Sequence, residues 1–141
     1  MGTELGWPGT RLVELDRHEC LERLGSVPVG RIVYTEMALP AVQLVNFALT
    51  GETIVIRTAR GSKLAAAARH AVVAFETDRY DEPAGIGWSV TAVGPSRVAE
   101  DPDEIAFLAT LPLRPWAPGR RDHFILISAE RLTGRRIDRA G

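Results

Sequence analysis

The residues of this chain that could do chemistry gather in one polar segment, residues 57–63, with the sequence Arg-Thr-Ala-Arg-Gly-Ser-Lys. Lys63 is the only lysine among the 17 basic residues of the chain. An apolar β-branched run precedes the segment and an alanine-rich stretch follows it, which predicts a strand that ends in a loop opening a helix. Free N–H groups at a helix start, surrounded by guanidinium, hydroxyl and ammonium groups, suit a phosphate-like anion.

Two interpretations of this segment stay open, an anion site and a solvated helix start that Ser62 caps. A nucleotide-hydrolysing P-loop is excluded, because its glycine spacing is absent and Lys63 is followed by Leu64 rather than by Ser or Thr.

Other candidate residues lie in strand-like runs. Trp88 and Ser89 begin such a run just after Gly85 and Gly87, and glycine lets a second backbone or a flat ligand approach closely. Asn46, between Val45 and Phe47, is an amide inside an apolar run and needs hydrogen-bond partners if it is buried. A single tryptophan in such a run is usually a core residue, and the partners of Asn46 are either backbone groups or the polar edge of a ring ligand.

Composition excludes several classes of function. A net charge of −1 provides no general field for nucleic acid or an anionic membrane, and no apolar window reaches the length of a membrane span. The single cysteine, Cys20, cannot form an internal disulfide, which favours a reducing cytoplasm. The three histidines have no partner at a metal-ligand spacing, so we expect no metal site. The sequence also indicates no catalytic acid, base or nucleophile.

The remaining patterns predict a small β-rich domain. Residues 1–12 are expected to be a loose leader, and residues 13–141 a single domain. Asp16 and Glu19 form a capping-box pattern that predicts a helix over about residues 17–24. Strands are expected at residues 29–35, 41–49, 53–58, 71–77, 87–98, 124–127 and 131–137, and further helices at about 62–70 and 102–111. A charged loop is expected at residues 78–82 and a bend at Gly94-Pro95. This order favours a mostly antiparallel barrel with short helices.

Six segments, taken in chain order, resemble the pyridoxamine 5′-phosphate oxidase-like, FMN-binding split-barrel family, in particular its small actinobacterial-type branch. They are residues 29–32 (VGRI), 45–47 (VNF), 56–58 (IRT), 61–63 (GSK), 73–78 (VAFETD) and 87–90 (GWSV). The resemblance covers about residues 15–137.

The resemblance implies a six-stranded split barrel that forms a homodimer, with FMN at each end of the dimer interface. The residues that it assigns to the cofactor phosphate are Arg57, Thr58, Ser62 and Lys63. Those that it assigns to the flavin ring or ribityl chain are Val45, Asn46 and Phe47, and, from the partner subunit, Trp88 and Ser89. Arg57 and Thr58 point to opposite faces of a regular strand, so both reach one phosphate only if the strand ends there. Pyridoxal phosphate synthesis is not expected, because the extra arginine and histidine contacts of true pyridoxamine phosphate oxidases have no counterpart near the C-terminus.

Four functional hypotheses follow. The first is an FMN-dependent oxidoreductase acting on a small-molecule substrate. The second is a deazaflavin (F420)-dependent reductase or binding protein, in which Arg60, Arg69, Arg120 and Arg121 would form a basic track for the acidic tail of F420. The third is a non-catalytic flavin-binding module or sensor, and the fourth an anion-loop protein without a flavin.

Overall fold

The computed structural model describes residues 3–4, 9–113 and 123–139. Its helices are α1 (Arg17–Leu24), α2 (Ser62–Ala68) and α3 (Pro102–Leu108). Its strands are β1 (Thr3–Glu4), β2 (Thr10–Glu14), β3 (Val29–Glu36), β4 (Leu39–Asn46), β5 (Ala48–Thr50), β6 (Thr53–Thr58), β7 (Val72–Asp81), β8 (Ile86–Val98), β9 (His123–Ser128) and β10 (Arg131–Arg139).

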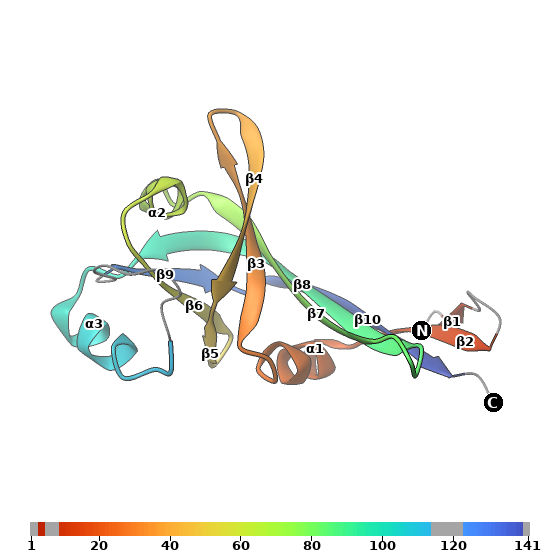
Figure 1. The fold of residues 1–141 in the computed structure, drawn as a ribbon. Helices are drawn as coiled ribbons and strands as arrows, with labels where there is room; N and C mark the ends of the chain where they lie inside the picture. The colour runs from red at the N-terminus through yellow and green to blue at the C-terminus, as the bar shows by residue number, and fades with distance from the viewer. Residues whose placement is uncertain (1–2, 5–8, 114–122, 140–141) are drawn as a thin grey trace.

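Antiparallel pairing closes these strands into a barrel. β8 pairs with β7, β7 with β3, and β3 with β4, and β4 continues through Phe47 into β5. β5 pairs with β6, β6 with β9, and β9 returns to β8. With β4 and β5 counted as one bent strand, the described residues form the six-stranded ring that the family resemblance implies. β10, β2 and β1 extend the sheet from β8 beyond the barrel (Figure 1).

The helices close the barrel and cover its flank. Asp16 and Glu19 form the predicted capping box, and the buried Cys20 and Leu24 anchor α1 in the barrel core. The alanines of α2 let it approach β3 and β8 closely, and Ala66 and Ala67 are buried there. α3 covers a smaller cluster around Val55, Phe124 and Leu108. No helix of the described residues has the length and apolar character needed to cross a membrane.

Several predicted boundaries are wrong. The strand expected over residues 41–49 breaks at Phe47, because the Phe47 N–H bonds to Pro28 O and the Phe47 ring is edge-on to Phe75 in the core. The loop expected at residues 78–82 is mostly strand, since β7 pairs with β8 through Asp81. The leader expected over residues 1–12 overlaps β2, which pairs with β10. The second and third helices end at Ala68 and Leu108, earlier than expected.

The bend predicted at Gly94-Pro95 lets β8 belong to two sheets. β8 pairs with β10 as far as Val93 and with β9 from Ser96 onward. A Cβ atom added at Gly94 would lie 1.7 Å from the carbonyl oxygen of Ser128. Only glycine therefore lets the backbones cross at this corner.

We expect Gly94→Ala to destabilise the fold by about 1–3 kcal/mol or more, because the obstructing atom is backbone. Urea unfolding followed by circular dichroism measures the change. Gly61→Ala is the matched control, since a Cβ there meets nothing within 4 Å and its φ of 165° is extended backbone. Equal stabilities of the two variants would contradict this account of the corner.

Candidate functional site

Ser62 and Lys63 lie at the start of α2, where a chain of hydrogen bonds joins them to β3 and β4. Lys63 Nζ donates to Gln43 Oε1 at 2.8 Å, and Gln43 Nε2 donates to Tyr34 Oη at 2.9 Å. Tyr34 Oη lies 2.7 Å from Ser62 Oγ. Ser62 and Lys63, both predicted site residues, are neighbours in the sequence. The chain of hydrogen bonds ties their side chains to Tyr34 and Gln43 of the β3–β4 hairpin.

Sequence reasoning missed Tyr34 and Gln43. Tyr34 alternates with Ile32 on the inward face of β3, where an aromatic residue is expected simply to fill the core. The sequence does contain a feature that points to Gln43 as a site residue, because Gln43 is a second amide inside the same apolar run as Asn46. A polar residue on the inward side of a strand needs a partner, and that requirement could have linked Gln43 to the nearby loop.

The other two proposed phosphate residues, Arg57 and Thr58, face opposite sides of β6, as strand geometry predicts. Thr58 is buried on the barrel side, and its hydroxyl donates to the Ala59 carbonyl at 3.0 Å. The Arg57 guanidinium lies 5.2 Å from the centre of the Phe124 ring, on the α3 side. Arg57 would therefore have to reach past the end of β6 to share a ligand with Lys63.

The segment Val45, Asn46 and Phe47 belongs largely to the core. Val45 and Phe47 are buried, and their side chains pack in the main cluster. Asn46 is half-buried and pairs with Val29 across β3 and β4. A role of this segment in lining a ring ligand therefore depends on Asn46 and on backbone atoms.

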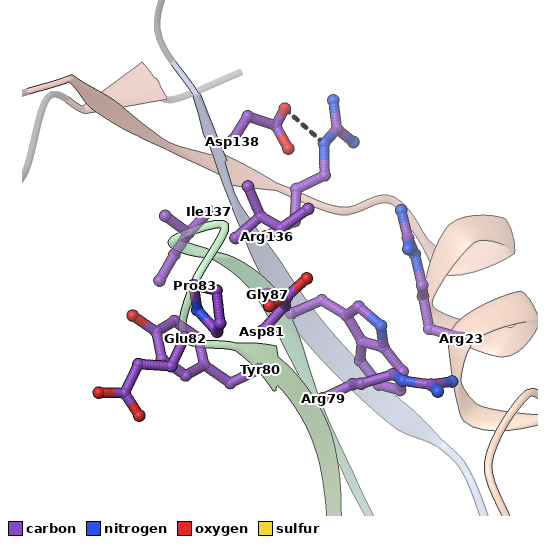
Figure 2. Close-up of a pocket in the computed structure, with 12 residues that line it drawn as sticks. Arg23, Arg79, Tyr80, Asp81, Glu82, Pro83, Gly87, Arg136, Ile137 and Asp138 are labelled. Carbon is purple, nitrogen blue, oxygen red and sulfur yellow. Dashed lines mark hydrogen bonds and ion pairs between the residues drawn. The ribbon is translucent and has the colours of Figure 1, made fainter.

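Trp88 and Ser89 lie on opposite faces of β8. Trp88 lines a pocket of about 580 Å³ between α1, the β7–β8 hairpin and the end of β10, and Arg23 lies 5.9 Å from the Trp88 ring centre. Figure 2 shows Arg23 and Arg79 on one side of this pocket and Tyr80 on the other. Ser89 lines a pocket of about 490 Å³ on the opposite face, with Thr91 and Thr133. Trp88 and Ser89 both border a third, smaller pocket of about 390 Å³.

Among the described residues, no three His, Cys, Asp or Glu side chains are grouped to hold a metal ion. Burial raises the pKa of the Cys20 thiol, and nearby Asp16 and Glu19 raise it further, so this cysteine is protonated and enclosed rather than nucleophilic. What the site offers is a hydroxyl and an ammonium group beside a barrel that carries aromatic side chains.

The family model described as pyridoxamine 5′-phosphate oxidase matches residues 16–136. The chain belongs to this family. An uncharacterised protein of Mycobacterium tuberculosis is 37% identical over 131 residues, which make up 89% of this chain and 86% of that protein.

Two solved structures are similar to this chain in both fold and sequence. One, from Corynebacterium glutamicum, is named as a candidate pyridoxamine 5′-phosphate oxidase; it is 36% identical, with a TM-score of 0.78 over 89% of this chain and 97% of its own. The other is an FAD-binding protein of Mycobacterium smegmatis, 34% identical, with a TM-score of 0.73 over 88% of this chain and 96% of its own.

In this member of the pyridoxamine 5′-phosphate oxidase family, the outward face of the barrel sheet carries a cluster of three charged side chains, Arg31, Glu76 and Asp78. Arg31 Nη1 lies 3.1 Å from Glu76 Oε1 and 3.6 Å from Asp78 Oδ2. Burial raises the pKa of the Glu76 carboxyl and Asp78 raises it further, while Arg31 opposes them. The folded state therefore binds the Glu76 proton more tightly than the unfolded state does.

The free energy of unfolding should therefore decrease as pH rises. The decrease begins near pH 4.5, the ordinary pKa of a glutamate, and continues through the raised pKa of Glu76 in the folded protein. We expect Glu76→Gln to raise the thermal midpoint at pH 7.5, and the gain to shrink toward pH 4.5. Glu104→Gln is the control of opposite sign, because the hydrogen bond from Arg97 lowers the Glu104 pKa. It should lower the midpoint at pH 7.5 and have little effect at low pH. A loss of stability at pH 7.5 in both variants would contradict the assignment.

Proposed function

We propose that this protein is an FMN-binding oxidoreductase that holds the cofactor phosphate with Ser62 and Lys63. The observation that carries the proposal is the chain of hydrogen bonds at the start of α2, which holds the Lys63 ammonium and the Ser62 hydroxyl side by side against Gln43 and Tyr34. An ammonium and a hydroxyl at one place are suited to an anionic ligand. In a family that includes a relative named as FAD-binding, a flavin phosphate is the anion that fits this arrangement best.

The donor set suits a phosphate dianion. A lysine ammonium and a serine hydroxyl provide charged and neutral donors from adjacent residues, and hydrogen bonds from charged donors are the stronger class. The Thr58 hydroxyl and the Arg57 guanidinium would complete the anchor, each by turning from its present partner at the end of β6.

The ring of the flavin would lie against Asn46 on one subunit and against Trp88 or Ser89 on the other. When bound, the flavin supplies the hydride or electron chemistry, and the protein supplies position and electrostatics. For this reason no side chain of the site is assigned as a catalytic acid or base.

Flavin binding is tested by titrating the protein with FMN, FAD, F420 and riboflavin, following the fluorescence of each compound. We expect saturable binding of FMN, and a loss of about 10- to 100-fold in FMN affinity for Lys63→Met, because one charge-assisted hydrogen bond contributes about 1.5–3 kcal/mol. Arg69→Met, at the other end of α2, is the matched basic control and should bind FMN normally. An unchanged FMN affinity in Lys63→Met would refute the anchor.

The same titration separates the alternatives. F420 needs a basic track for its acidic tail, so preference for F420, with a loss of affinity in Arg69→Met, would move the protein to the deazaflavin reductases. Binding of flavin without reduction by any nicotinamide donor would favour the non-catalytic module. Tighter binding of FAD than of FMN would extend the ligand to the dinucleotide.

The proposed homodimer uses the outward face of the barrel sheet. Val42, Val33, Ala74 and Val93 lie side by side across β4, β3, β7 and β8, and we call these four residues the apolar row. Val42 is 60% exposed, and Leu44, two residues further along β4, is 51% exposed. Val33, Ala74 and Val93 are partly exposed. An apolar surface of this kind, if contiguous, is typical of a protein–protein interface. A second copy of the chain is the partner that the family resemblance supports.

We expect Val42→Asp to shift a dimer toward monomer in size-exclusion chromatography with light scattering, because it puts a charge into the apolar row. Phe107→Asp is the control: Phe107 is 53% exposed, but it lies on α3, away from the row. If the unsubstituted protein is monomeric at micromolar concentration, or if both variants remain dimeric, the proposed interface is wrong.

A further inference from the structure

A pocket of about 580 Å³, which we call the Trp88 pocket, lies between α1, the β7–β8 hairpin and the end of β10. This volume falls within the range of about 300–1,000 Å³ that small-molecule sites occupy. The described residues that line it come from α1, β7, β8, β10 and the turn between β7 and β8, and not from α2. The proposed phosphate anchor at Ser62 and Lys63 therefore does not account for this pocket.

The Trp88 pocket and the proposed dimer surface lie on opposite faces of β8. Ser89 and Val93 are four residues apart, so both lie on the outward face, where Val93 belongs to the apolar row. Trp88 lies on the other face, together with its cross-strand partner Arg79. A flavin ring held at an interface built on the apolar row would therefore contact Ser89 and leave the Trp88 pocket open to a second ligand.

Two guanidinium groups lie beside Trp88. The Arg23 guanidinium lies over the Trp88 ring, 5.9 Å from its centre, and Arg79 pairs with Trp88 across β7 and β8. Figure 2 shows both arginine side chains on the same side of the pocket. Among the described residues, neither arginine forms an ion pair with a carboxylate. Their charges are therefore available to an anionic ligand, and a guanidinium matches the two oxygens of a carboxylate.

The acidic residues of the pocket limit the charge of that ligand. The third arginine, Arg136, is already paired, because its Nε lies 2.8 Å from Asp138 Oδ2 and its Nη1 lies 3.1 Å from Glu19 Oε2. Asp81 and Glu82 also line the pocket, so its three arginines are balanced by three carboxylates, namely Asp81, Glu82 and Asp138. A ligand with one negative charge fits this balance, whereas a phosphate dianion would be repelled by the acidic side.

The apolar part of the pocket is aromatic. Trp88 is half-buried and lines the pocket, and so does Tyr80, which is 62% exposed. A Cβ atom at Gly87 would lie 2.8 Å from Tyr80 Cδ1, so the lack of a side chain at Gly87 lets the Tyr80 ring lie against β8. Aromatic side chains favour a flat aromatic ligand, which packs against them in offset-stacked or edge-to-face geometry.

We propose that the Trp88 pocket is a second ligand site, which binds a planar aromatic monocarboxylate. The ring of the ligand packs against Trp88, and its carboxylate accepts hydrogen bonds from Arg23 and Arg79. The inference does not rest on the proposed function, because no residue of the phosphate anchor takes part in it. It gives the protein a recognition site for a small molecule besides its cofactor.

The probe is 2-naphthoate, and the uncharged 2-naphthamide is its matched analogue. Each compound is titrated into isotope-labelled protein while NMR follows the indole N–H signal of Trp88, which is assigned by its absence in Trp88→Phe. We expect 2-naphthoate to shift this signal saturably, with a dissociation constant of about 1 mM or lower for a ligand of this size. We expect 2-naphthamide to bind about 5- to 10-fold more weakly, because it lacks the charge-assisted hydrogen bonds.

Arg79→Met removes one guanidinium and breaks no ion pair, so we expect the variant to fold normally. It should weaken 2-naphthoate binding by about 5- to 10-fold and leave 2-naphthamide binding within about twofold, and Arg23→Met should do the same. Arg79→Lys should recover part of the loss, because it restores the charge without the planar fork. Arg131→Met, at the end of β10 away from the pocket, is the matched control and should bind both probes normally.

Three results would overturn the inference. Without a saturable shift of the Trp88 signal, there is no site for an aromatic acid. Equal affinities for 2-naphthoate and 2-naphthamide, or an Arg131→Met loss as large as that of Arg79→Met, would refute recognition of the carboxylate by the pocket. Tighter binding of AMP than of 2-naphthoate would make the ligand a nucleotide rather than a monocarboxylate.

The same titrations with saturating FMN separate this inference from the proposed function. We expect one dissociation constant for 2-naphthoate with and without FMN, and the same value in Lys63→Met. Competition between FMN and 2-naphthoate would put the flavin in the Trp88 pocket, and would overturn both the second site and the anchor at Lys63. If the protein binds 2-naphthoate through Arg79 but binds no flavin, this inference stands and the proposed function fails.

Discussion

The proposed cofactor site depends on one interaction, the hydrogen bond from the Lys63 ammonium to the side-chain amide oxygen of Gln43. This bond holds the ammonium group against the β3–β4 hairpin. It also requires β4 to lie beside α2, and that arrangement depends on the bend at Phe47, which sends the chain from β4 into β5 on the other side of the barrel. The charge of the site and the closure of the barrel are thus parts of one arrangement.

The barrel separates the proposed cofactor contacts within one subunit. Ser62 and Lys63 lie at the α2 side, whereas Trp88 and Ser89 lie where β8 pairs with the end of β10. A single ligand that used both groups would need them to come from different copies of the chain. The apolar row on β4, β3, β7 and β8, exposed at Val42 and partly exposed elsewhere, provides a surface on which a second copy could pack. In this way the dimer and the composite cofactor site support each other as one proposal.

Local signals in the sequence predicted much of this structure. The capping box at Asp16 predicted α1 with its correct bounds, and the turn at residues 50–52 predicted the β5–β6 hairpin. The break at Phe47 was missed, because it is caused by a tertiary contact with Phe75 that alternation of apolar residues does not reveal. The β7 strand was cut short for a similar reason: its charged end is stabilised by the ladder to β8 rather than by its own composition. Lys63 was found because it is the only lysine. Tyr34 and Gln43 were missed because their role depends on which strands become neighbours.

The most direct test of the central claim is a crystal structure of the protein with FMN bound. The account predicts a phosphate whose oxygens lie about 2.7–3.0 Å from Lys63 Nζ and Ser62 Oγ, with Gln43 still accepting from Lys63. An FMN phosphate bound elsewhere, for example beside Arg23 and Arg79 in the Trp88 pocket, would contradict it.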